Sequence, residues 1–180
     1  VVDSGVDGAH AAFADAVVEV GWTAPRTPDD EDVEGAADGD GHGTHVASIV
    51  AALAPGVRLV PVRVFDDRGR SSLHAVTAAL RRVLAHSRDH ASVRRVVNLS
   101  LCFRRQRPDV GLQQALNALR AAGVAVVAAA CNEGDPAAQH GFPNYAGVLV
   151  VGAADADGAL APFSSYAPRP TVATLALGVG

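Results

Sequence analysis

"RRVVNLSLCFRRQRPDVGLQQALNALRAAGVAVVAAA" (residues 94–130) is the stretch that decides the fold class. It begins and ends with apolar runs, residues 94–101 and 123–130, which have the length and composition of buried strands. Between these runs, apolar residues recur at helical spacing at Leu112, Ala115, Leu116 and Leu119. A strand, a helix and a second strand in this order predict a parallel βαβ unit.

The same alternation extends through the rest of the chain. Residues 57–65, "VRLVPVRVF", predict another strand, and residues 147–153, "GVLVVGA", predict one more. The first of these strands is followed by a second helical stripe, formed by Leu73, Val76, Leu80, Val83 and Leu84. We therefore expect a single α/β domain over residues 1–180, with a mostly parallel sheet and helices on both faces.

Composition excludes several classes of protein. The chain has 180 residues, of which 49% are hydrophobic and 19% charged, and these values are typical of a globular domain. A net charge of −4 gives no basic surface for a polyanion, so we expect no nucleic-acid partner. The longest apolar stretch, residues 121–131, is too short for a membrane span. The chain starts on a strand-like segment without an initiator Met or a signal peptide, and we interpret both ends as cuts.

Chemistry is expected where predicted strands end, because ligands gather beyond the carboxyl ends of parallel strands. Asp3 follows the first apolar run, His42 opens the helical segment "HGTHVASIVAAL", and Asn132 follows the run that ends at residue 130. Each residue also has a structural interpretation. Asp3 before Ser and Gly is an ordinary turn or cap signal, and Asn132 is suited to cap a helix. His42 and His45 could share a metal, although the HExxH pattern of zinc proteases is absent.

An acid, a histidine and an amide donor together are what acyl transfer requires. The acid orients the imidazole, the histidine moves the proton of the nucleophile, and the amide meets the oxyanion. Acyl transfer is therefore the chemistry that we expect from Asp3, His42 and Asn132.

Five motifs resemble those of the subtilisin-like serine peptidases, the subtilases: "DSGVDGAH" (3–10), "HGTHVAS" (42–48), "NLSL" (98–101), "AAACNEG" (128–134) and the run "GFPNYAGVLVVGAADADGALAPFSSYAP" (141–168). The resemblance covers essentially the whole chain. It implies a three-layer subtilisin-like fold and a serine endopeptidase that acts on peptide or protein substrates. By the same resemblance Asp3 is the triad acid, His42 the general base and Asn132 the oxyanion donor, while Thr44 and His45 pack behind the site.

The resemblance also implies a substrate site. Ser100 and Leu101 would pair by their backbone with an extended substrate, and the walls of the primary pocket would be formed by Ala129, Ala130 and Gly141. Cys102 and Cys131 stand where the family usually has glycine, after neighbouring strands. Three interpretations stay open for these cysteines: a narrowed pocket, a disulfide that closes it, or two free thiols that fill space.

The nucleophile is missing from the resemblance. Subtilases carry it in a Gly-Thr-Ser-x-Ala segment, which does not occur here. The serines that are present match other positions of the family or begin a helix, namely Ser4, Ser71, Ser72, Ser164 and Ser165. We expect the nucleophile beyond residue 180, with the C-terminal part of the domain missing, so that the 180-residue chain alone is inactive.

Two alternatives remain at this point: a noncatalytic, subtilase-like domain that binds peptide or serves as a scaffold, and a metalloenzyme that uses His42 and His45. We expect no cofactor and no metal, since Ala12 stands where the family usually has a calcium-binding acid. The acidic loop from Asp29 to Asp40 is interpreted as solvated, with weak cation binding as the alternative. A monomer is expected, and the resemblance makes secretion or the cell envelope a plausible location.

Overall fold

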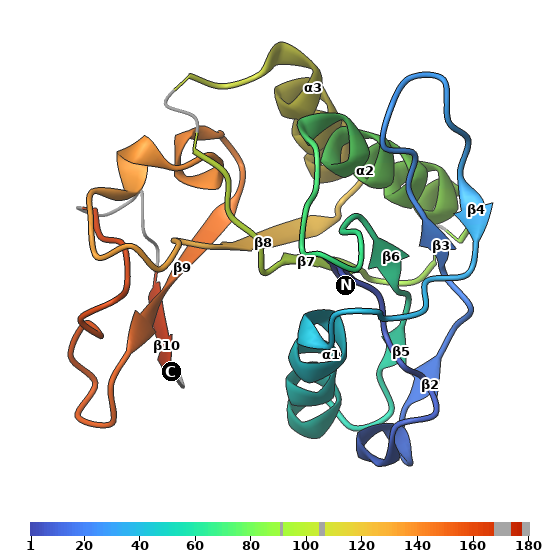
Figure 1. The fold of residues 1–180 in the computed structure, drawn as a ribbon, viewed down its shortest axis with the longest axis horizontal. Coiled ribbons are helices and arrows are strands. Elements are labelled where there is room, and N and C mark those ends of the chain that lie inside the picture. The colour runs from blue at the N-terminus through green and yellow to red at the C-terminus, as the bar shows by residue number, and fades with distance from the viewer. Residues whose placement is uncertain (91, 105–106, 168–173, 178–180) are drawn as a thin grey trace. The chain divides into compact units, whose positions relative to one another are not determined.

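The computed structural model of the chain describes residues 1–90, 92–104, 107–167 and 174–177 (Figure 1). The chain forms two compact units, residues 1–86 and 87–180. Within the described ranges, no helix is both long enough and apolar enough to cross a membrane.

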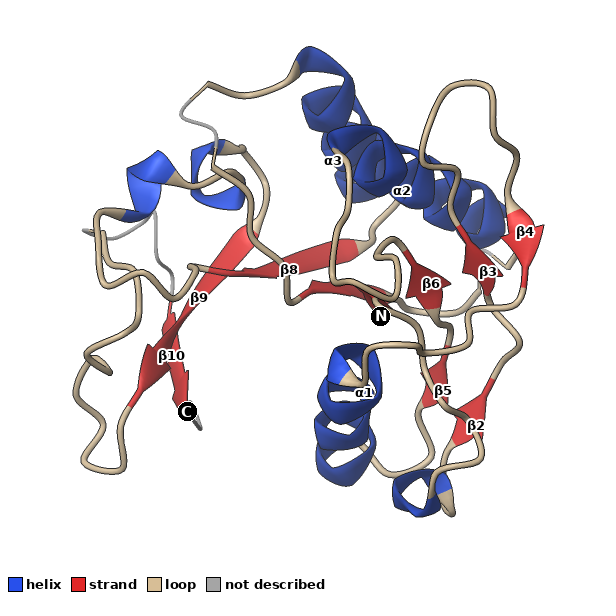
Figure 2. Ribbon diagram, in the orientation of Figure 1, coloured by secondary structure: helices blue, strands red, loops and turns tan. Residues whose placement is uncertain are grey.

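The first unit contains a four-stranded sheet in the order β1-β6-β3-β4 (Figure 2). These strands are β1 (Val2–Asp3), β6 (Val62–Arg63), β3 (Trp22–Thr23) and β4 (Val33–Glu34). Both β1 and β3 run parallel to β6, whereas β4 is antiparallel to β3. A separate parallel pair is formed by β2 (Val17–Val18) and β5 (Arg58–Leu59). The edge strand β4 is therefore the antiparallel strand in an otherwise parallel arrangement.

The predicted strand over residues 57–65 is two short strands, β5 and β6. Pro61 lies between them and has no N–H to donate to a strand ladder, so the pairing is interrupted there. The carbonyl of Pro61 is still used, because it accepts a hydrogen bond from Trp22 N at 3.2 Å.

Helix α1 (His42–Leu53) packs one face into the core of the first unit. Its buried residues, Gly43, Ala47 and Ala51, are four positions apart and lie on one face of the helix. Ala47 and Ala51 pack in a cluster with Val6, Phe13 and Leu59, and Phe13 belongs to the 3-10 helix η1 (Ala11–Phe13). In α2 (Leu73–Asp89), Val76 and Leu80 of the predicted stripe are buried, and the other three are half-buried.

The second unit contains a parallel sheet in the order β10-β9-β8-β7. Its strands are β7 (Val96–Leu99), β8 (Ala125–Ala129), β9 (Leu149–Ala154) and β10 (Thr174–Leu177). Two short 3-10 helices, η2 (Ala137–Gln139) and η3 (Phe142–Asn144), lie between β8 and β9 along the chain. Because β7 pairs with β8 from Val96↔Ala125 to Leu99↔Ala128, the segments that follow these two strands leave the sheet side by side.

Helix α3 (Val110–Ala121) connects β7 to β8, and the predicted βαβ unit is confirmed. All four residues of its predicted stripe are buried, which are Leu112, Ala115, Leu116 and Leu119. Asp109 starts the helix, since its Oδ1 accepts a hydrogen bond from Leu112 N at 3.1 Å. The α/β class with mostly parallel pairing is confirmed, although the strands are divided among three sheets.

Candidate active site

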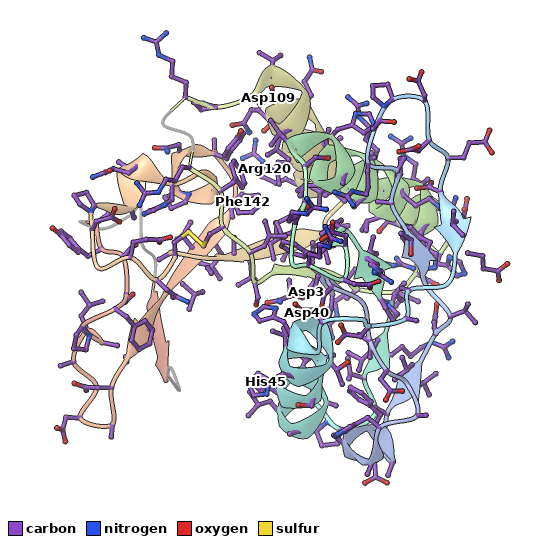
Figure 3. The ribbon with its side chains drawn as sticks, viewed as in Figure 1. Asp3, Asp40, His45, Asp109, Arg120 and Phe142 are labelled. Carbon is purple, nitrogen blue, oxygen red and sulfur yellow. A yellow bond between two sulfur atoms is a disulfide. The ribbon has the colours of Figure 1, made fainter. Side chains whose placement is uncertain are left out.

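Strand β1 ends at Asp3 (Figure 3) and helix α1 begins at His42, and a hydrogen bond joins the two side chains. His42 Nδ1 lies 2.7 Å from Asp3 Oδ1, which also accepts a hydrogen bond from Ser4 N at 2.8 Å. Asp3 is 1% exposed, whereas the His42 side chain is half-exposed. A buried carboxylate therefore holds one edge of an imidazole whose other edge remains accessible.

The hydrogen bond from Asp3 is the main cause that raises the pKa of His42 above its ordinary value of 6.5. Partial burial of the ring opposes this shift, while the charges of Asp3, Asp40 and Asp38 add to it. A histidine in this setting is a stronger base than in water. The arrangement suits the acceptance of a proton at the accessible nitrogen.

Two glycines explain how β1 and α1 approach so closely. A β-carbon on Gly43 would lie 2.1 Å from the carbonyl oxygen of Gly5 and 3.1 Å from Asp3 Cβ. Gly5 has a φ of +112°, and a β-carbon there would lie 2.5 Å from the carbonyl oxygen of Ala37. A side chain on Gly43 would push the helix away from the strand end, and one on Gly5 would clash with the backbone of residues 36 and 37. The Asp3–His42 contact depends on this close approach.

Asp38 is a part of this site that the sequence analysis missed. Its Oδ1 accepts hydrogen bonds from Ser4 Oγ and Gly41 N, both at 2.8 Å, and its Oδ2 accepts one from Thr44 N at 2.9 Å. Asp38 thus ties the loop before α1 to the residue that follows Asp3. Its carboxylate satisfies a free backbone N–H of the first helical turn, which Gly41, as the N-cap, has no side chain to do.

The interpretation of residues 29–40 as a simple solvated loop is wrong at Asp38. Partial burial acts to raise the pKa of Asp38, but hydrogen bonds from Thr44, Gly41 and Ser4 outweigh it and hold this pKa well below its ordinary value. The available signal was a carboxylate placed shortly before a helix start. The surrounding run of acidic residues obscured this signal.

Thr44 has the structural role expected of it, since its Oγ1 donates to Asp38 and accepts a hydrogen bond from Asp7 N at 2.9 Å. His45 is exposed on α1, so the expectation that it packs behind the site is wrong (Figure 3). In the described part of the chain, His42 and His45 belong to no group of three metal-ligating side chains. The hydrogen bond to Asp3 already gives the Nδ1 atom of His42 a partner within the protein.

The second unit carries the remaining candidates. Ser100 and Leu101 directly follow β7, and Asn132 follows β8 after two intervening residues. Leu101 is buried, and Ser100 Oγ accepts a hydrogen bond from Asn98 Nδ2 at 3.0 Å. Asn132 is exposed, and its backbone N donates to Glu133 Oε2 at 3.1 Å. The side chain of Asn132 is thus presented to solvent at the end of a buried strand.

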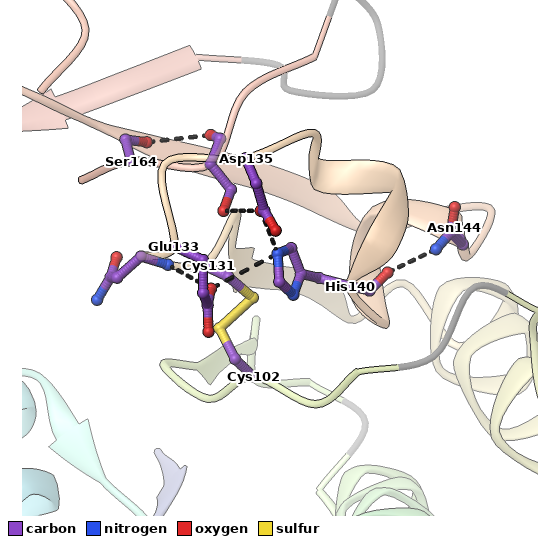
Figure 4. Close-up of a disulfide and its surroundings, with 9 residues drawn as sticks. Cys102, Cys131, Glu133, Asp135, His140, Asn144 and Ser164 are labelled. Atoms are coloured by element: carbon purple, nitrogen blue, oxygen red, sulfur yellow. Dashed lines mark hydrogen bonds and ion pairs between the residues drawn. A yellow bond between two sulfur atoms is a disulfide. The ribbon is translucent and has the colours of Figure 1, made fainter. Parts of the chain in front are cut away.

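Cys102 and Cys131 form a disulfide with a Cα–Cα distance of 5.8 Å (Figure 4). Of the three open interpretations, the disulfide is the one that the structure has. Cys131 is buried and has a φ of +82°, whereas Cys102 is exposed. The bridge joins the segment after β7 to the segment that carries Asn132.

Ala129 ends β8 and Ala130 leads on to Cys131, with Ala130 buried and Ala129 half-buried. Gly141 is buried beneath Phe103, because a β-carbon on Gly141 would lie 2.1 Å from that ring. The Phe103 ring also lies 5.1 Å from Phe142 and 6.4 Å from Tyr145, between ring centres. Phe103 therefore covers Gly141, the residue that is expected to form part of the wall of the primary pocket.

A polar cluster around the buried His140 lies next to the disulfide (Figure 4). His140 is fully buried, and its Nε2 lies 2.6 Å from Asp135 Oδ1 and 3.5 Å from Glu133 Oε2. Ser165 Oγ donates to Asp135 Oδ1 at 3.1 Å. The hydrogen bond from His140 is the largest cause that lowers the pKa of Asp135. Donor atoms of Cys131, Glu133 and His140 lie within 4.8 Å of one another, but the sulfur is in the disulfide.

Comparison with known proteins finds relatives across the whole chain. Residues 1–177 match the model of the subtilase family. A subtilisin-like protease of Coccidioides posadasii is 32% identical over 191 residues, covering 99% of this chain and 45% of that protein. Subtilisin DY of Bacillus licheniformis is 36% identical over 140 residues, covering 71% of this chain and 48% of that protein. The chain spans about half the length of these relatives.

The fold has a counterpart among solved structures. A cold-adapted subtilisin-like serine proteinase superposes with a TM-score of 0.77 and 24% identity, over 98% of this chain and 61% of that one. At this identity the superposition is evidence for the fold alone. Family membership rests on the sequence matches. With a family model that covers nearly every residue, the chain belongs to the subtilase family.

Proposed function

We propose that the chain is part of a subtilisin-type serine endopeptidase, in which Asp3 and His42 belong to an Asp-His-Ser triad. The observation that carries this proposal is the 2.7 Å hydrogen bond between His42 Nδ1 and the buried Asp3 carboxylate. It keeps the Nδ1 proton on the side of Asp3 and leaves Nε2 free to accept a proton. Membership of the subtilase family supports a protein or peptide substrate.

The proposed nucleophile is a serine outside residues 1–180, in the same peptidase domain. The serine hydroxyls of the first unit have other partners. Ser4 Oγ donates to Asp38, Ser48 Oγ to the His45 carbonyl and Ser71 Oγ to the Val64 carbonyl. The relatives are about twice as long as this chain, which leaves room for the missing element.

In the proposed reaction, His42 Nε2 takes the proton of the serine hydroxyl as the serine oxygen attacks the peptide carbonyl carbon. The tetrahedral intermediate carries an oxyanion, to which the Asn132 side chain donates a hydrogen bond. His42 then gives the proton to the leaving amine, and an acyl-enzyme remains. Water attacks the acyl-enzyme by the same route, with His42 again as base and then as acid, and frees the serine.

Substrate binding is proposed for the segments that follow β7 and β8. Ser100 and Leu101 would pair by their backbone with an extended peptide, while Ala129 and Ala130 would face the side chain before the scissile bond. Phe103 covers Gly141, and by the resemblance to the subtilases the Cys102–Cys131 bridge stands where the family usually has glycine. These two features favour a substrate with a small side chain before the cleaved bond.

The test is labelling of the complete protein with a fluorophosphonate, which reacts only with an activated serine hydroxyl. We expect strong labelling of the wild type and loss of labelling in His42→Ala. The exposed His45→Ala serves as the matched control and should label like the wild type. Folded wild-type protein that does not label would contradict the peptidase and leave a noncatalytic peptide-binding domain.

A further inference from the structure

The Cys102–Cys131 disulfide lies directly beside the proposed oxyanion donor. We propose that this bridge is a positioning element, which holds the backbone before Asn132 in the conformation that aims its side chain at the oxyanion. The inference rests on the proposed function, because it gives the disulfide a part in the same reaction. Cys102 and Cys131 act through Asn132 and not on the substrate carbonyl.

The first observation is the backbone of Cys131. Its φ of +82° lies in the left-handed region, and it is the one residue other than glycine with a positive φ in the described ranges. A side chain makes this region unfavourable, so an uncrosslinked residue here tends to return to negative φ. Such a return would rotate the peptide that joins Cys131 to Asn132 and would redirect the Asn132 side chain.

The second observation is what the bridge connects. Leu99 pairs with Ala128 across β7 and β8, so the segments that follow them start from a fixed distance. The disulfide joins the same two segments a second time, three residues beyond Leu99 and Ala128. Its Cα–Cα distance is 5.8 Å. Cys131 is therefore held by a covalent bond as well as by the sheet.

The third observation is that the backbone on both sides of Asn132 has fixed partners in the same unit. Ala130 N donates to the Val151 carbonyl and Gly134 N to the Phe163 carbonyl, both at 2.8 Å. The Cys131 carbonyl accepts a hydrogen bond from Ser165 N at 2.8 Å. Between these anchors, Asn132 is exposed. Its direction therefore depends on the dihedral angles of the residue before it as well as on its own.

The bridge is open to reduction from one side, because Cys102 is exposed whereas Cys131 is buried. A thiolate of a dithiol reductant attacks Cys102 Sγ, forms a mixed disulfide and releases Cys131 as a thiolate. The second thiol of the reductant then closes its own disulfide and releases Cys102. Two electrons pass from the dithiol to the protein, and the restraint on Cys131 is lost.

The test compares three forms of the complete protein: the wild type, Cys102→Ser with Cys131→Ser, and Cys102→Ser with Cys131→Gly. Both variants lack the bridge, but only glycine adopts a positive φ without a steric penalty. We expect kcat of the serine variant to fall about 100-fold, the loss that a misplaced catalytic group of about 1 Å produces. KM should change far less, because the oxyanion contact forms in the transition state.

The glycine variant should recover at least about tenfold in kcat over the serine variant, and a dithiol should no longer lower its kcat. A bridge that only stabilises the fold would leave kcat of the folded serine variant unchanged, and glycine would then restore nothing. Either of these results overturns the positioning role. Circular dichroism before each assay ensures that only folded protein is compared.

Failure of the proposed function is recognised separately, since an unreactive wild type shows no fluorophosphonate labelling. Amide hydrogen exchange at Gly134 then tests the positioning role without catalysis, because this amide donates to Phe163 at 2.8 Å. We expect faster exchange in the serine variant than in the wild type, and protection close to that of the wild type in the glycine variant. Equal exchange in all three proteins would refute the proposal.

Discussion

His42 Nδ1 and Asp3 Oδ1 lie 2.7 Å apart, although the two residues are separated by 39 positions in the sequence. The contact joins the end of a strand to the first residue of a helix. It places a buried negative charge against one nitrogen of a half-exposed ring. The hydrogen bond favours the neutral tautomer that carries its proton on Nδ1, in which Nε2 is the base.

Replacement of Asp3 by Asn should lower the pKa of His42. The hydrogen bond from Asp3 is the largest cause of the raised pKa, so its loss moves the midpoint back toward 6.5. Titration of the His42 ring protons by NMR in the complete protein measures this midpoint, with His42→Ala to assign the signal. Asp29→Asn, a change in the exposed acidic loop, should leave the midpoint in place.

The same shift gives a pH dependence with a definite sign. Because the folded pKa of His42 is raised above the unfolded value, the pair contributes its full stability below pH 6.5 and loses it as the pH rises through the folded pKa. Activity has the opposite trend, since a general base must be unprotonated. We expect kcat/KM to rise through a midpoint above 6.5. A midpoint at or below 6.5 in the wild type would contradict this prediction.

Asp38→Ala should destabilise the protein by about 0.5 to 2 kcal/mol, the usual cost of losing a side chain that caps a helix. The lowered pKa of Asp38 means that its contribution is present above pH 3.8 and is lost as the pH falls toward the folded pKa. Urea unfolding at pH 7 measures the change, and Glu31→Ala in the same loop is the matched control. An equal loss of unfolding free energy in the two variants would show that Asp38 acts only as a surface charge.

Gly43→Ala should cost about 1 to 3 kcal/mol, because the added methyl group has no space. Its β-carbon would lie 2.1 Å from the Gly5 carbonyl oxygen, and backbone cannot move aside as the end of a long side chain can. Gly8→Ala is the control, since its β-carbon would meet only the side chain of Val18 at 3.3 Å. Thermal unfolding compares the two variants. A wild-type Tm in Gly43→Ala would refute the close approach of α1 and β1.

Asp135→Asn should destabilise the second unit, because the charged acceptor that His140 and Ser165 contact is lost. Asp135 is bonded to the buried His140 and to Ser165, and its pKa is lowered mainly by His140. The contribution is therefore present above pH 3.8 and decreases as the pH falls below it. Guanidinium unfolding measures the effect. Asp157→Asn, in an exposed turn, should change stability by less than about 0.5 kcal/mol.

The helices and the parallel sheet of the second unit were predictable because long periodic segments carry their burial pattern in the sequence. The stripe of α3, from Leu112 to Leu119, is buried as expected. The short strands β2, β3 and β4 were not predicted, since two residues are too few to show a period. Their pairing comes from contacts with distant parts of the chain.

The candidate site was predictable where a residue stands at the end of a periodic segment, as Asp3 and His42 do. Asp38 was missed because it lies in a loop, where position depends on contacts and not on period. The sequence alone did not show whether Cys102 and Cys131 form a disulfide or remain free thiols. That decision required the register of β7 against β8, which brings the two Cα atoms to 5.8 Å.

The approach of Gly43 to Gly5 limits how this chain can be recombined with its relatives. A chimera that replaces residues 1–7 but keeps the start of α1 has to preserve this approach, because a β-carbon on Gly43 would lie 2.1 Å from the Gly5 carbonyl oxygen. Crossovers between these segments are therefore expected to yield misassembled hybrids. Shuffling libraries should inherit the strand end, the Asp38 loop and the first helical turn from one parent.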